Sequence, residues 1–254
     1  MNGVSGINNN SYQNNLYHAQ LSSGKKHPTA AAGPVETAVL QKEIEQLKGY
    51  EAGLDNISSA ESAARIADGG MSGVTDSLQR IEELSVRMAN GTMSESDKEI
   101  YRNEISQMAD GIGDALSSTK YNEQDLLKSD GTVSVATDSN GGTQGLRLQD
   151  LSELVKSIKS GDYDIESISN ALDKVSSGRS RIGAQTNALE HAMNINRNSA
   201  YDVTTASSRL GDTEYGGTIS NMKRNEALQN YQIQMQRRQI QNQQTAANGW
   251  MMSL

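Results

Sequence analysis

The spacing of apolar residues predicts that most of the chain after residue 34 is helical. Val, Leu, Ile and Met recur every three or four positions, with polar residues between them. This period places the apolar side chains on one face of an amphipathic helix. The spacing predicts long helices over about 35–66, 72–89, 95–118, 165–210 and 218–246, with a short helix over 150–158. We interpret the triplet Asp68-Gly69-Gly70 as a break or kink between the first two.

Heptad spacing within these segments predicts a shared core. The positions Val74, Leu78, Ile81, Ser85 and Met88 are separated by 4, 3, 4 and 3 residues, which is the spacing of a seam that packs against partner helices. Similar ladders occur in the helices over 95–118 and 165–210. The predicted core residues are Val74, Leu78, Ile81, Met88, Ile105, Met108, Ile112, Ile182, Leu189 and Met193.

Leu84 lies at the edge of the first seam. At 100° per residue, the spacing predicts that it lies on the flank of the helix, between Arg80 and Arg87. Two interpretations stay open at this point. Leu84 is either a half-buried residue at the seam edge, with the stems of the two arginines lying beside it, or part of an exposed binding patch.

Local signals predict one turn and one β-hairpin. Asn90-Gly91 ends a helix, and Ser94 with Asp97 three residues later is typical of a helix N-cap. Between 129 and 150 the apolar period changes to two on either side of a Ser-Asn-Gly-Gly turn, which predicts a hairpin. These signals divide the chain into 1–34, a mostly disordered or degenerate arm; 35–128 and 151–210, two parts of a helical rod; 129–150, the hairpin; and 211–254, a terminal-helix arm.

The predicted fold class is mainly α: an elongated antiparallel bundle of long helices with one small hairpin, and arms that are flexible in the monomer. Hydrophobic residues make up 35% of the chain, aromatics 4%, and Phe is absent, which suits a slender bundle better than a thick core. The last helix carries a thin apolar stripe at Met222, Leu228, Tyr231 and Met235, and such a stripe needs a partner to fold.

Charge and composition exclude several classes of function. A net charge of −8 with scattered basic residues argues against binding nucleic acid, and no run approaches the length of a membrane span. The first 25 residues lack the pattern of a secretory signal peptide. The chain has no Cys, and its three His residues are isolated, so the sequence predicts no catalytic site, no cofactor and no metal site.

Several segments resemble bacterial flagellins. Residues 78–91, LQRIEELSVRMANG, are similar to the motif LQRxxELxxQxANG of that family, and LSSG at 21–24 also fits. Residues 181–194, RIGAQTNALEHAMN, resemble the region RxxLGAxQNRLE, and residues 207–215, SSRLGDTEY, resemble the segment SRIxDxDY. The motifs occur in the family's order in both halves of the chain.

This resemblance implies a self-assembling subunit of the flagellar filament that is exported through the flagellar channel and located outside the cell. It implies a minimal form without large inserted domains. The N-terminal arm departs from the family, because it is short and contains Pro28 and Pro34. A flagellar export chaperone and the filament cap are the implied partners. The implied assembly residues of the C-terminal arm are Leu228, Tyr231, Met235 and Leu254.

The resemblance also implies recognition by Toll-like receptor 5. The contact residues of the family match Arg80, Leu84 and Glu104 of this chain, while Glu82 and Arg87 depart from the usual residues. Three alternatives stay open beside the filament subunit. They are a hook–filament junction protein, a flagellin-like paralogue that does not polymerise normally, and a secreted helical effector or binding module.

Overall fold

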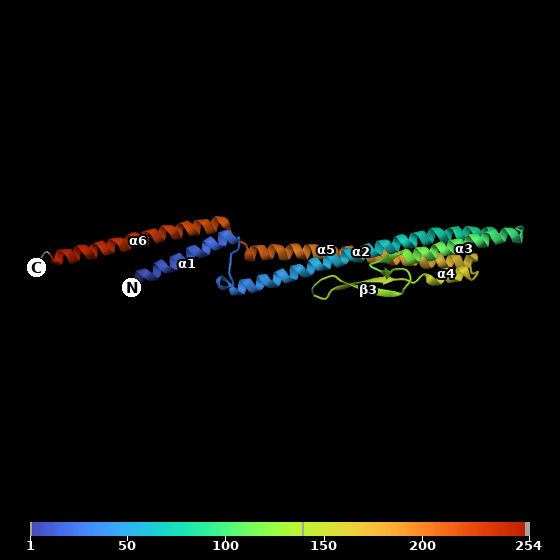
Figure 1. Cartoon of the computed structure of the whole chain (residues 1–254), viewed down its shortest axis with the longest axis horizontal. Coiled ribbons are helices and arrows are strands. Elements are labelled where there is room, and N and C mark those ends of the chain that lie inside the picture. The colour runs from blue at the N-terminus through green and yellow to red at the C-terminus, as the bar shows by residue number, and fades with distance from the viewer. Residues whose placement is uncertain (1, 139, 252–254) are drawn as a thin grey trace. The chain divides into compact units, whose positions relative to one another are not determined.

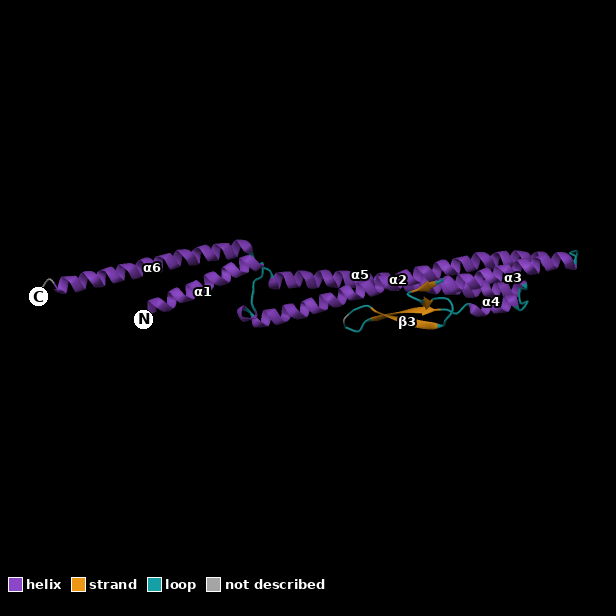
Figure 2. Ribbon diagram, in the orientation of Figure 1, coloured by secondary structure: helices purple, strands orange, loops and turns teal. Residues whose placement is uncertain are grey.

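The structure is a computed structural model that describes residues 2–138 and 140–251, and it is mainly helical, as Figure 2 shows. Side chains are described over 10–138 and 140–245. The mainly α fold class is confirmed. The elements are α1 Asn2–Ser23, η1 Ala30–Ala32, α2 Pro34–Met88, α3 Glu95–Ser118, β1 Lys120–Tyr121, β2 Gln124–Asp125, β3 Gly131–Ala136, β4 Thr143–Leu148, α4 Ser152–Lys159, α5 Ile165–Gly211 and α6 Tyr215–Met251 (Figure 1).

The chain forms two compact units. One consists of Leu47–Tyr201, and the other consists of Met1–Gln46 together with Asp202–Leu254. The long helices α2 and α5 contribute residues to both units. The larger unit contains the hydrophobic core, and the smaller unit contains the two terminal helices α1 and α6.

The predicted break at Asp68-Gly69-Gly70 is wrong, because α2 continues through it. Asp68 accepts a hydrogen bond from Nε of Arg179 in α5 at 2.9 Å, and the two side chains form an ion pair. A side chain at Gly70 would collide with Thr119 and with Leu127. Tight packing therefore accounts for this glycine, and the tertiary contacts offset its low helix propensity of about 1 kcal/mol relative to Ala.

The core of the larger unit is formed by α2, α3, α5 and the segments between α3 and α5. Val74, Leu78 and Ile81 are fully buried, and Ile105, Ile112 and Ile182 are buried in the same cluster. Met88 and Met108 pack against that cluster and are partly buried. A second, smaller cluster surrounds Leu189, with partly buried Met193 packed against it.

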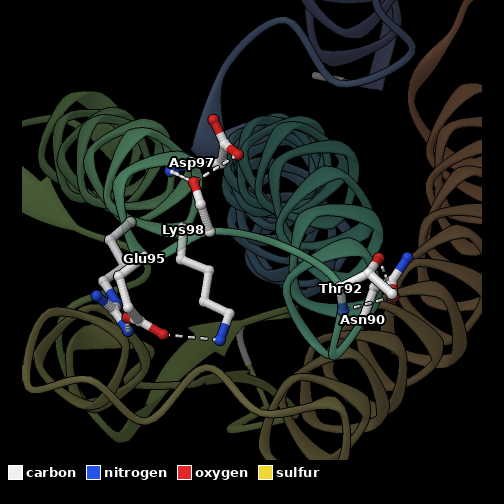
Figure 3. A network of polar contacts seen from close by, with 7 residues as sticks. Asn90, Thr92, Glu95, Asp97 and Lys98 are labelled. Atoms are coloured by element: carbon white, nitrogen blue, oxygen red, sulfur yellow. Dashed lines mark hydrogen bonds and ion pairs between the residues drawn. The ribbon is translucent and has the colours of Figure 1, made fainter.

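The turn between α2 and α3 has the predicted N-cap. The Asp97 main-chain N–H donates to Ser94 Oγ at 3.2 Å, and Ser94 has the extended backbone of an N-cap residue. Figure 3 shows this turn, in which Thr92 bonds to the side chain of Asn90 and Lys98 pairs with Glu95. These contacts end α2 and start α3 within a few residues.

The predicted hairpin is formed by β3 and β4, which pair antiparallel from Gly131 opposite Leu148 to Ala136 opposite Thr143. Val135 and Leu146 are buried, so one face of the hairpin belongs to the core. The hairpin is held at its tip by Asn196 of α5, whose side chain donates to the main-chain oxygen of Thr137. The predicted hairpin is therefore confirmed, and the structure adds the register of its two strands and the face that is buried.

A second, two-residue ladder between β1 and β2 was missed by the sequence reasoning. Its turn residues Asn122 and Glu123 have φ values of 47° and 65°. This left-handed conformation is tolerated by Asn but is uncommon for Glu, so the sequence carried a weak turn signal.

Within the predicted N-terminal arm, residues 2–23 form α1. Pro34 is the first residue of α2, where its missing N–H and fixed φ are compatible with a helix. Between them, Thr213 N–H donates to the oxygen of Gly24 at 2.9 Å, and Lys26 N–H donates to the oxygen of Gly211 at 2.7 Å. These bonds attach the end of α1 to the junction of α5 and α6.

Candidate functional site

The first candidate site is the flank formed by α2 and α3 in the larger unit. Arg80 of α2 forms ion pairs with Glu83 at 2.9 Å and with Glu104 of α3 at 3.2 Å. Hydrogen bonds to Glu83 and then to Glu104 raise the pKa of the Arg80 guanidinium above its ordinary value. The structure thus brings together two of the three residues implied as receptor contacts. Both remain accessible, with side-chain exposures of 41% for Arg80 and 37% for Glu104.

The third residue, Leu84, is fully buried, with an exposed fraction of 0%. The expectation that it lies on the flank, half-buried or exposed between Arg80 and Arg87, is wrong. In the structure the buried face of α2 includes Ser85 as well, whose hydroxyl donates to the main-chain oxygen of Tyr163 at 2.6 Å. A helix covered by neighbours on more than one side buries a wider arc than a single heptad seam. Leu84 therefore lies beneath the flank and supports it.

The second candidate site is the apolar side of α6. The implied assembly residues Leu228, Tyr231 and Met235 are 50%, 62% and 40% exposed. The fourth implied residue, Leu254, lies outside the described residues. Met222, which the sequence reasoning put on the same side, is half-buried instead. These three large apolar side chains lie within two helical turns of one another on the surface of α6.

A further set of α6 residues faces α1, and the sequence reasoning missed it. Asn225 Nδ2 donates to the main-chain oxygen of Asn10 and to Oδ1 of Asn14, both at 3.0 Å. Gln229 Nε2 donates to Ser11 Oγ at 3.0 Å. We call this set the amide seam. Its members are Asn10, Ser11 and Asn14 of α1 and Asn225, Gln229 and Gln232 of α6.

The signal for the amide seam is present in the sequence but not in its apolar pattern. Asn225, Gln229 and Gln232 are separated by 4 and 3 residues, which is the heptad spacing. Apolar periodicity does not register amides, so it indicates only the apolar side of α6. Across the described part of the chain, no group of three or more His, Asp or Glu residues is placed to hold a metal ion.

Comparison with known proteins identifies the family of the chain that carries these two surfaces. The family model described as the bacterial flagellin N-terminal helical region matches residues 1–132, which is more than half of the chain. The chain belongs to the bacterial flagellin family. The family is one of structural proteins rather than enzymes, and the chain is a structural subunit of the bacterial flagellar filament, an extracellular part of the flagellum.

Relatives of the family are similar over most of their length. A flagellin of Halalkalibacterium halodurans is 28% identical, with 88% of this chain and 86% of the relative covered. The flagellar filament 30.7 kDa core protein of Treponema maltophilum is 27% identical, with 92% of this chain and 90% of the relative covered. Flagellin similarity therefore extends beyond the matched N-terminal region into the C-terminal half.

A solved structure supports the fold. The structure of a putative flagellar hook-associated protein from Vibrio parahaemolyticus has a TM-score of 0.61, with 12% identity, and covers 71% of this chain and 100% of that one. At this identity the similarity concerns the fold alone.

No described helix of this flagellin-family chain contains an apolar stretch that could cross a membrane.

Proposed function

We propose that this filament subunit leaves the cell by flagellar export and that neighbouring copies in the filament cover the apolar side of α6. The observation that carries the proposal is the exposure of Leu228, Tyr231 and Met235 on one side of a single helix. Exposed apolar surface of this kind favours association, because burying it releases about 25 cal/mol per Å². Self-assembly therefore has a driving force in the C-terminal arm.

Electron microscopy of the sheared cell-surface fraction, with the protein identified by mass, tests this proposal directly. We expect long fibres that contain this chain. Protein confined to the base of fibres made of another subunit would indicate the hook–filament junction alternative. Monomeric protein in the medium, with no fibres, would indicate a non-polymerising paralogue or a secreted effector.

Replacing the apolar side of α6 tests which residues drive assembly. The variant Leu228→Ser/Tyr231→Ser/Met235→Ser is expected to raise the critical concentration for polymerisation at least about tenfold, because it removes the surface that neighbours bury. The measurement is the monomer concentration left after sedimentation of seeded fibres. A matched control is Asn230→Ser/Gln234→Ser, which changes exposed polar residues of the same helix and should polymerise normally. Equal critical concentrations for both variants would contradict the proposal.

We also propose that α6 is bound by a flagellar export chaperone before assembly and that the filament cap receives the chain afterwards. The support is family membership together with the exposed apolar residues Leu228 and Tyr231, which need cover in the unassembled chain. A chaperone that binds this side of α6 would compete with polymerisation.

The flank of α2 and α3 is our proposed contact surface for Toll-like receptor 5. Arg80 and Glu104 are accessible and paired, so they present a fixed arrangement of charge. Leu84 acts from beneath by packing, because it has no exposed surface. Glu82 and Arg87 differ from the residues usual in the family, and charges at an interface affect selectivity and association rate.

Arg80→Ala is expected to weaken receptor binding at least about tenfold while leaving the fold intact, because exposed ion pairs contribute little to stability. The measurements are affinity for the receptor ectodomain and signalling in reporter cells. Arg65→Ala is the matched control, since Arg65 is an exposed arginine of the same helix with its own ion pair to Glu61. If Arg80→Ala and Arg65→Ala bind like the unaltered protein, the flank is not the contact surface.

A further inference from the structure

The loop that joins β3 to β4 contains the dipeptide Asn140-Gly141 at the tip of the hairpin. Both residues are exposed, and Gly141 has a positive φ of 90°. Apart from its two chain neighbours, no atom of the described residues lies within 4 Å of the position that a Cβ of Gly141 would occupy. The main-chain nitrogen of Gly141 is therefore shielded neither by a side chain of its own nor by packing from another element.

The carboxamide of Asn140 has no hydrogen-bond partner among the described residues. The main-chain N–H of Asn140 donates to Asp138 Oδ1 at 2.7 Å, and the N–H of Gly142 donates to the same oxygen at 3.0 Å. These two bonds hold the main chain on either side of Gly141. They leave the Asn140 side chain free to turn toward the Gly141 nitrogen, which is the next atom group along the chain.

The other Asn-Gly dipeptides of the chain are held in other ways. In the turn between α2 and α3, Asn90 Oδ1 accepts hydrogen bonds from the Thr92 N–H at 3.2 Å and from Thr92 Oγ1 at 2.9 Å (Figure 3). Asn2-Gly3 and Asn248-Gly249 lie within α1 and α6, where the main chain keeps helical dihedral angles. Among these dipeptides, the hairpin tip leaves both reacting groups least restrained.

We propose that Asn140 is a site of spontaneous modification, which converts this position to aspartate and isoaspartate. The nitrogen of Gly141 attacks Cγ of Asn140, so that an N–Cγ bond forms and the Cγ–Nδ2 bond breaks. The leaving Nδ2 group takes the proton of the Gly141 N–H and departs as ammonia. Water then opens the cyclic imide at either of its carbonyl carbons. Because the attack is intramolecular and water is the only co-reactant, the reaction needs no enzyme.

Either product disturbs the hairpin tip. Aspartate places a second carboxylate beside Asp138, and like charges at short range repel each other. Isoaspartate also adds a CH2 group to the main chain of the loop, which is closed by the hydrogen bond from the Thr137 N–H to the oxygen of Gly142 at 2.8 Å. Asn56 of α2 and Asn196 of α5 hold the main chain just before this loop. The modification therefore loosens the attachment of the hairpin to both helices.

The test uses the full-length protein, incubated in mildly alkaline buffer and sampled over time. Mass spectrometry of its proteolytic peptides, with fragmentation that distinguishes aspartate from isoaspartate, measures conversion at each Asn-Gly dipeptide. We expect conversion at Asn140 to be at least about tenfold faster than at Asn90 in the same sample, because a restrained side chain reaches the attacking geometry less often. Conversion at Asn140 that is no faster than at Asn90 would overturn the proposal.

The matched control is Asn140→Gln, whose longer side chain closes the imide ring more slowly and should stay unmodified over the same period. Hydrogen exchange of residues 131–148 then measures the effect on the hairpin. Incubated unaltered protein should exchange faster than fresh protein, whereas incubated Asn140→Gln should exchange like its fresh form. Fresh Asn140→Asp carries the added charge without the lengthened main chain, so it should show only part of the increase.

Neither measurement needs a polymer, so the outcome is independent of the proposed assembly through α6. Exchange that stays unchanged in fully converted protein would overturn the proposed loosening of the hairpin. Faster exchange in incubated Asn140→Gln as well would also overturn it, because the change would then have arisen elsewhere in the chain.

Discussion

Leu84→Ala is expected to lower the free energy of unfolding of the larger unit by about 3 kcal/mol. Leu84 has no exposed surface and belongs to the main core cluster, together with Leu78 and Ile81. Removing its three outer carbon atoms leaves a cavity that close-packed neighbours fill only in part. Urea denaturation followed by circular dichroism measures the change.

The control for this variant is Val86→Ala, two residues further along the same helix. Val86 is 53% exposed, so its truncation should change stability by less than about 1 kcal/mol. If both variants unfold like the unaltered chain, Leu84 is not packed in the core. The result also separates two causes of lost receptor binding, since Leu84→Ala would act through stability and Arg80→Ala through contact.

Gly53→Ala is expected to displace the β-hairpin and to lower the free energy of unfolding by about 2 kcal/mol. The methyl group would overlap the main-chain oxygen of Thr137, the atom that Asn196 also holds. Backbone atoms cannot move aside as a flexible side chain can, so the hairpin must shift. This cost exceeds the gain in helix propensity of about 1 kcal/mol that alanine brings. Hydrogen exchange of residues 131–148 and denaturant unfolding measure the effect.

Gly73→Ala provides the opposite expectation in the same helix. Apart from its two chain neighbours and the backbone of its own helix, no atom of the described residues lies within 4 Å of the position its methyl group would occupy. Helix propensity then acts alone, and the variant should be more stable by up to about 1 kcal/mol. If Gly53→Ala is stabilising to the same extent as Gly73→Ala, the hairpin does not dock against α2 at Thr137.

The sequence predicted those features that depend on neighbouring residues. Apolar periodicity identified the main helices, and the predicted range 95–118 coincides with α3. The Ser94 cap follows from local hydrogen bonding, and the hairpin from alternation on both sides of a turn. Of the candidate sites, Arg80 and Glu104 were indicated by the resemblance to the family, and the structure shows that they form an ion pair between α2 and α3.

The sequence alone determined that most of the chain after residue 34 is helical, where a cap starts α3, and that the chain is a flagellin-like helical protein, but not that residues 2–23 form a helix. Tertiary structure decided what faces what. Leu84 is buried because neighbouring elements cover a wider face of α2 than the heptad seam alone. A glycine is present at position 70 of this helix because Thr119 and Leu127 occupy the space that a side chain would need. The helix α1 pairs with α6 through amides such as Asn14 and Asn225. Which helices pair depends on contacts between segments that are distant in the sequence. Apolar periodicity indicates the apolar contacts of a helix but not its hydrogen bonds between amide side chains.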